Sequence, residues 1–201
     1  MVRYSLVLLA GGLLLGCSTA PTEQPAPPTR AATARAKQAT GPELAVKAYL
    51  SWYAAHHDEF TASFIEGSGD TTQFYRVSQP AAEVWLARLR QSGHFSAAYV
   101  QGWRTYIRSY ADTLRLHPQN DGPPAGFSYD LLMLSQEPDV RLEELQTGTF
   151  TTRYAGPAGA TVLARGAQHE GWREGLDFTL TKNAANKWLI DSIEVPDNLT
   201  Q

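Results

Sequence analysis

The sequence predicts an α+β domain, in which about three N-terminal helices pack on an antiparallel sheet of about four strands. Two observations carry this prediction. From Pro42 to about residue 116, apolar side chains recur at the spacing of helices with one buried face. From about residue 147 they alternate with polar ones, as in half-buried strands. Helices followed by strands favour an arrangement in which the helices cover one sheet face.

Proline, serine and glycine delimit the first two predicted helices. The stretch GPELAVKAYLSWYAAHHDEF begins a helix at Pro42, because proline suits the first helical turn. A second helix is expected within 78–93, with Ser78 as a possible N-cap and Gly93 at the end. The apolar side of this second helix is expected to hold Val84, Trp85 and Leu89.

A third helix fits residues 96–116. One stripe of this helix carries its apolar side chains: Val100, Trp103, Ile107, Tyr110 and Leu114. Four aromatic residues stand about one turn apart on it: Tyr99, Trp103, Tyr106 and Tyr110. Such rings pack beneath a sheet, or they line a cavity with their polar tips, and both can hold along one helix.

Four strands are expected after the turn-rich stretch HPQNDGPPAG. They span 147–154, 160–167, the stretch GLDFTLTKN and the stretch KWLIDSIEV, with AGPAGA and NAAN as turns. Alternation places Leu176, Phe178 and Leu180 on one face. Counted by two, Asp191 falls beside Leu189 and Ile193 in the last strand. We expect Trp103 and Trp188 to anchor the core.

The only cysteine among the 201 residues, Cys17, directly follows a short apolar run. Arg3 is the only charge before it, which is the layout of an export signal. The stretch LLGC (14–17) resembles the lipobox of bacterial lipoproteins, whose cysteine is acylated after export. The resemblance implies a lipoprotein signal peptide over 1–17 and a membrane anchor of acyl chains on Cys17. Ser18 favours the outer membrane, facing the periplasm.

The composition divides the remainder into a tether and one domain. Residues 18–41 are rich in Ala, Thr and Pro and hold no large apolar side chain, which predicts a disordered tether. Residues 42–201 have the length of a single domain. The formal net charge of −3 and the lack of a basic stripe argue against a nucleic-acid partner.

Several kinds of chemistry find no support in the sequence. A lone cysteine excludes an internal disulfide and a thiolate metal cluster. His56 and His57 are adjacent on a helix and diverge, so we expect no metal and no cofactor there. The GSG at 67–69 lacks the strand–turn–helix context of a nucleophile elbow.

Two short segments carry a resemblance to a known family. DLLMLSQE (130–137) and KWLIDSI (187–193) resemble the DUF3828 family, a domain of unknown function in the NTF2-like class, and AYLSWY fits its aromatic opening. The resemblance covers roughly 43–195. It implies a cone in which a curved sheet wraps round helices and leaves a cavity. Glu137 stands where the family has Asp, and the family implies no activity.

The expected function is binding without catalysis, either of a small ligand or of a protein partner. The candidate ligand-binding residues are Tyr99, Trp103, Tyr106, Tyr110, Asp130, Gln136, Glu137 and Asp191. One alternative is a cavity-based hydrolase or isomerase that uses carboxylates from Asp130, Glu137, Glu174 and Asp191, with Tyr106 as a donor. Another is an immunity-type lipoprotein that neutralises a toxin. An open cavity favours a small ligand or an enzyme, and a filled cone with an exposed apolar patch favours a protein partner.

Overall fold

The computed structural model describes residues 41–67 and 72–196. Contacts divide the chain into the units Met1–Gln38 and Ala39–Gln201, and the described residues all belong to the second. The predicted signal peptide, Cys17 and nearly all of the predicted tether lie outside the described residues. Within the described ranges, no helix combines the length and the apolar character needed to cross a membrane.

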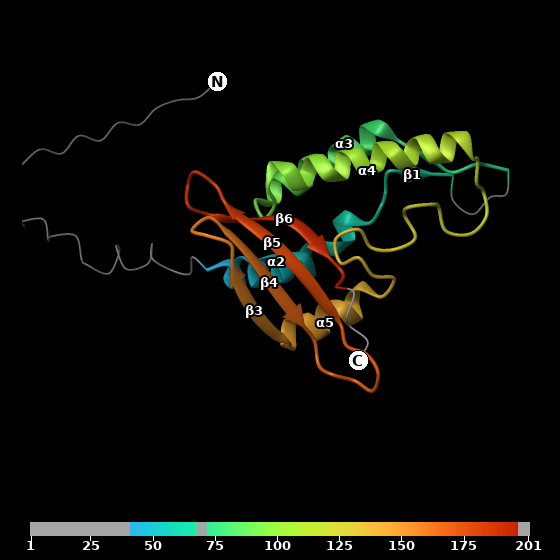
Figure 1. The fold of residues 1–201 in the computed structure, drawn as a ribbon. Coiled ribbons are helices and arrows are strands. Elements are labelled where there is room, and N and C mark those ends of the chain that lie inside the picture. The colour runs from blue at the N-terminus through green and yellow to red at the C-terminus, as the bar shows by residue number, and fades with distance from the viewer. Residues whose placement is uncertain (1–40, 68–71, 197–201) are drawn as a thin grey trace, which may run out of the picture. The chain divides into compact units, whose positions relative to one another are not determined.

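The domain is α+β, as predicted. Its helices are α2 (Pro42–His56), the 3₁₀ helix η2 (His57–Phe60), α3 (Gln79–Ser92), α4 (Ala97–Leu116) and α5 (Pro138–Thr147). Its strands are β1 (Ile65–Glu66), β2 (Arg76–Val77), β3 (Thr149–Tyr154), β4 (Gly159–Arg165), β5 (Gly175–Lys182) and β6 (Trp188–Glu194). The last four strands form an antiparallel meander in the order β3-β4-β5-β6 (Figure 1). Strands β1 and β2 pair separately.

One face of the meander is buried beneath helices. The buried side chains alternate along the strands, as in Leu176, Phe178 and Leu180 of β5, which confirms the predicted face. Helix α2 packs against β3, β4 and β6, α5 against β4, and α4 against β6 (Figure 1). The helices therefore cover the sheet from the side on which its apolar residues lie.

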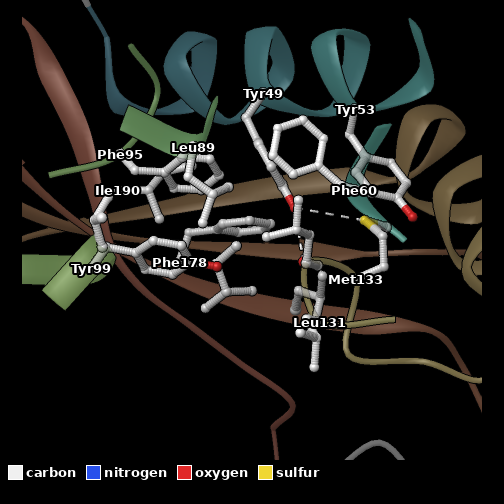
Figure 2. Packing of buried hydrophobic residues seen from close by; sticks show 14 of the residues in the cluster. Tyr49, Tyr53, Phe60, Leu89, Phe95, Tyr99, Leu131, Met133, Phe178 and Ile190 are labelled. Carbon is white, nitrogen blue, oxygen red and sulfur yellow. Dashed lines mark hydrogen bonds between the residues drawn. The ribbon is translucent and has the colours of Figure 1, made fainter. Parts of the chain in front are cut away.

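Side chains fill the space between α2 and the sheet. Leu131, Leu132 and Met133, from the segment that resembles DUF3828, are at most 2% exposed. Tyr49 reaches from α2 across this core, donates its hydroxyl to the Leu132 carbonyl at 2.8 Å and points towards Met133 (Figure 2). Its ring also meets Phe178 edge-on, at 5.8 Å between centroids. Residues 131–133 are therefore part of the core between α2 and the sheet.

One expectation about α3 is corrected. Ser78 is the N-cap residue and Gly93 ends the helix in the left-handed conformation at φ 70°, both as expected, although the Ser78 side chain makes no capping hydrogen bond. Val84 is 54% exposed rather than buried. The buried face consists of Ala82, Trp85, Leu86 and Leu89, which are spaced three, one and three residues apart, and Val84 lies off that stripe.

The charged stretch after residue 137 forms helix α5, so the domain has one more helix than predicted. Residue 147 belongs to this helix, and β3 begins at Thr149. Three side chains of α5 are buried, namely Arg141, Leu142 and Leu145. In a sequence, an arginine is expected at the surface. The buried face of α5 therefore does not appear as an apolar stripe in the sequence.

The outer edge of β6 is covered by the segment that joins α3 to α4. Ser96 N donates to the Ile190 carbonyl and Ile190 N donates to the His94 carbonyl, both at 2.9 Å. Phe95 thereby forms a parallel bridge with Ile190. At the other edge of the sheet lies β3.

Candidate functional site

Helix α4 carries a continuous row of aromatic rings, as its sequence predicts. Ser96 caps the helix, since its Oγ accepts the N–H of Tyr99 at 3.2 Å. Along the row, the ring centroids of Tyr99 and Trp103 are 6.2 Å apart, those of Trp103 and Tyr106 are 5.2 Å apart, and those of Tyr106 and Tyr110 are 4.6 Å apart. The first two contacts are edge-on, an arrangement that aromatic pairs prefer.

A surface pocket of about 230 Å³ lies between α4 and β6. The residues that line it are Ala98, Tyr99, Gly102, Trp103, Tyr106, Asp191, Ser192 and Ile193. Four of the predicted ligand-binding residues therefore share this pocket: Tyr99, Trp103, Tyr106 and Asp191. We refer to it as the α4–β6 pocket.

A β-bulge brings Asp191 to this pocket. Leu180 pairs with Ile190 and Thr179 with Ser192, so Asp191 is the extra residue of β6. Ile190 and Ile193 are both buried, which means that the buried face changes phase across the bulge. The prediction of an unbroken alternation through Asp191 to Ile193 was therefore wrong. Asp191 itself is half-buried, and its side chain makes no ion pair or hydrogen bond within the described part of the chain.

Tyr99 belongs more to the core than to the pocket. The residue is 7% exposed, its ring stacks on Phe95 at 4.5 Å, and it lies among the core residues near Phe178 (Figure 2). Its hydroxyl makes no well-formed hydrogen bond with any described residue. Burial raises the pKa of the Tyr99 phenol well above its ordinary value, and the Trp103 indole N–H opposes that rise. Trp103 is only half-buried, so of the two predicted tryptophan anchors only Trp188, at 5% exposure, is buried.

Tyr106 and Tyr110 are tied to the loop that follows α4. Tyr106 Oη donates to the Gly126 carbonyl at 2.8 Å and lies 3.0 Å from Tyr129 Oη. Tyr110 packs on Gly126, and a Cβ added to Gly126 would come within 2.4 Å of the Tyr110 ring. Gly126 itself has φ 82°. The loop therefore fixes both rings, and Tyr110 does not line the α4–β6 pocket.

Asp130 and Gln136 lie at a different pocket, of about 330 Å³, together with Tyr129. Asp130 Oδ1 accepts the N–H groups of Leu132 at 2.9 Å and Met133 at 2.6 Å. Burial raises the pKa of Asp130, and those hydrogen bonds oppose the rise. Gln136 is exposed at the rim. These contacts make Asp130 the residue that holds the buried 131–133 turn.

The remaining candidate acids are elsewhere. Glu137 is exposed at the start of α5. Glu174 forms an ion pair with the buried Arg141, whose Nη1 also donates to the carbonyls of Met133 and Leu134 at 2.8 and 2.7 Å. Asp130, Glu137, Glu174 and Asp191 thus stand in four separate settings. Sequence reasoning missed Arg141 and Tyr129, and neither carries a periodic signal that marks it.

The described residues contain no group of three or more His, Cys, Asp or Glu side chains that could hold a metal ion. His56 Nδ1 lies 2.8 Å from the Trp52 carbonyl and its ring stacks on Trp52, so this imidazole packs against its own helix. The GSG stretch is described only at Gly67, because Ser68 and Gly69 lie outside the described residues.

Comparison with known protein families, with curated proteins and with solved structures finds no match for this chain.

Proposed function

We propose that this chain is an envelope lipoprotein, anchored by acyl chains on Cys17, whose domain binds a partner and does not transform it. We propose further that the domain is an NTF2-like cone of the DUF3828 type. The four-stranded meander with helices on its buried face supports that assignment. The filled interior at residues 131–133 favours binding at the surface over binding inside a cone.

The observation that carries the proposal is the Asp191 carboxylate in the α4–β6 pocket. It has no cationic partner among the described residues, and it shares the pocket with Trp103 and Tyr106. Aromatic faces attract cations, and an adjacent carboxylate adds a charge–charge attraction. The pocket therefore suits a positively charged group, either a small amine or an Arg or Lys side chain of a protein partner.

The small volume of the pocket agrees with this class of ligand. About 230 Å³ is below the range of pockets that enclose a drug-sized molecule, roughly 300–1,000 Å³. One side-chain-sized group fits such a space, and a larger partner would lie over the surface around it. The carboxylate alternative for catalysis needs two acids in one pocket, and of the four candidates the α4–β6 pocket holds only Asp191.

The proposal is tested with Nα-acetyl-arginine amide as the probe and the citrulline equivalent as its uncharged match. Titration is followed by NMR through the Trp103 indole N–H signal. We expect the arginine probe to bind with a Kd of about 1 mM, because only one charged group is recognised. This Kd corresponds to a binding free energy of about −4 kcal/mol. Added salt should weaken binding, because the attraction is electrostatic and partly exposed.

Two variants decide the outcome. Asp191→Asn should weaken binding of the arginine probe by about fivefold or more, since Asp191 is the one charged side chain among the described residues that line the pocket. Glu194→Gln, at the exposed end of the same strand, is the matched control and should change the affinity by less than about twofold. Equal affinity for the arginine and citrulline probes would overturn the proposal.

A further inference from the structure

A second pocket, of about 470 Å³, lies where the start of α2 faces the β5–β6 hairpin. Leu44, Ala45 and Ala48 of α2 and Trp188 of β6 form its apolar walls. The polar side chains at its edge are those of His94, Asn186 and Lys187. None of the nine described residues that line it is acidic. Its volume lies within the range of small-molecule sites, about 300–1,000 Å³.

The Lys187 ammonium lies at this pocket and has no counterion among the described residues. The hairpin turn fixes its backbone, because Asn183 Oδ1 accepts the N–H groups of both Ala185 and Lys187 at 3.0 Å. The Lys187 Nζ stands beside Gly93, 3.3 Å from the position that a Cβ there would take. Among the described residues it makes no ion pair and no hydrogen bond. The nearest acid on α2, Glu43, is paired with Lys47 at 2.7 Å.

His94 lies next to this ammonium and is neutral at physiological pH. Burial, together with the charges of Lys187 and His56, lowers the pKa of His94 to about 4. The ring packs among aromatic neighbours, at 5.3 Å from Trp52 and 6.3 Å from Tyr49. A neutral imidazole offers one N–H donor, so the edge of the pocket presents hydrogen-bond donors and a single positive charge.

We propose that this pocket binds a small amphiphilic monoanion, namely a carboxylate with an apolar body such as a short fatty acid. The carboxylate is placed against Lys187 and His94, and the apolar chain against Leu44, Ala48 and Trp188. One ammonium matches one negative charge, which favours a monocarboxylate over a phosphate dianion. The site is separate from the α4–β6 pocket and does not depend on it.

The probe is octanoate, added to the full chain and followed through the NMR signals of the His94 ring, so that only binding at this pocket is read. A bound carboxylate favours the charged imidazolium, so octanoate should raise the pKa of His94 towards its ordinary value. The matched probe 1-octanol has the same chain but no charge, and it should leave the pKa unchanged or lower it through further burial. Acetate, which has the charge but no chain, should bind far more weakly than octanoate.

Four variants test the location of the site. Lys187→Gln should weaken the binding of octanoate about tenfold. The control is Lys182→Gln, on the preceding strand of the hairpin, where the ammonium lies over the Trp188 ring at 4.9 Å. This control should change the affinity for octanoate by less than about twofold. Ala48→Trp fills the pocket from an exposed helix position and should abolish binding of octanoate. Asp191→Asn should leave octanoate binding unchanged, which separates this proposal from the α4–β6 pocket.

Three results would overturn the proposal. The first is that octanoate and 1-octanol move the His94 pKa in the same direction. The second is that Lys187→Gln and Lys182→Gln weaken octanoate binding equally. The third is that the affinity of Ala48→Trp for octanoate equals that of the parent chain. Lys187 and Ala48 are both exposed, so these variants are expected to fold, and circular dichroism checks that they do.

Discussion

Arg141→Met is expected to be among the most destabilising changes in the domain. The side chains of Arg141 and Glu174 are only 10% and 19% exposed, and Arg141 also donates to two carbonyls of the buried turn that follows Asp130. Removing the arginine leaves those carbonyls without their charged donor and leaves Glu174 without its partner. Breaking a buried ion pair in this way costs about 3–5 kcal/mol. The expected loss of unfolding free energy is therefore about 3–5 kcal/mol.

Urea unfolding followed by circular dichroism measures this loss, provided that the denaturant slope is unchanged. Glu174→Gln keeps the shape of the side chain and should cost less, about 1–2 kcal/mol. In the double variant no buried charge is left unpaired, so its cost should fall short of the sum by at least about 1 kcal/mol. Arg115→Met is the matched control, because that side chain is 68% exposed, and it should stay within about 0.5 kcal/mol. A loss below about 1 kcal/mol for Arg141→Met would refute the reasoning.

Three further predictions concern pH, packing and anchoring. Because the folded pKa of His94, about 4, lies below its unfolded value near 6.5, its contribution to stability is present above about pH 6.5 and is lost as the pH falls towards 4. Between pH 7 and pH 4.5, the unfolding free energy of His94→Asn should therefore fall by about 1–2 kcal/mol less than that of the parent chain, as measured in urea titrations. Identical dependence of the unfolding free energy on pH in the two chains would contradict this. Trp188→Ala should cost about 3–5 kcal/mol, whereas Trp103→Ala, at a half-buried site, should cost distinctly less; equal losses would mean that the burial is misassigned. Cys17→Ser should release the protein from the membrane or leave it unprocessed, and an unmodified Cys17 in the mass spectrum of the mature protein would rule out lipidation.

The helices and strands that the sequence predicts correctly are those with a strong period. Val46, Leu50 and Tyr53 repeat at helical spacing and are all buried in α2. The alternation of Leu176 and Phe178 likewise predicts the buried face of β5. In both cases one face of a regular element packs on the core, so the periodicity of the sequence reports directly on burial.

The missed features lack such a period. Helix α5 buries Arg141, whose ion pair with Glu174 comes from a residue 33 positions later, and no local pattern reveals that contact. Strands β1 and β2 contain two residues each, too few to show alternation. At Asp191 the bulge inserts one residue, so that a count by two gives the wrong face beyond it.

The candidate site was predictable in part for the same reason. The row from Tyr99 to Tyr110 follows from helical spacing alone, and the structure keeps it continuous. Which acid meets that row depends on the register of β6 against β5, and this register is a tertiary property. The pocket at Lys187 is formed by α2, the α3–α4 connection and the last hairpin, so no single segment of the sequence predicts it.

The segment that covers the outer edge of β6 also affects how neighbouring molecules would associate on a membrane. A protein held on a membrane by acyl chains, as we propose for this chain, meets its neighbours in two dimensions, where encounters between identical molecules are frequent. Open strand edges are a common route by which such encounters become aggregates. At β6 the two hydrogen bonds of Ile190, donated to the His94 carbonyl and accepted from the Ser96 N–H, already occupy part of that edge. At β3 the exposed Arg153 places a charge on the other edge strand, so edge-to-edge strand pairing is disfavoured at both edges of the meander.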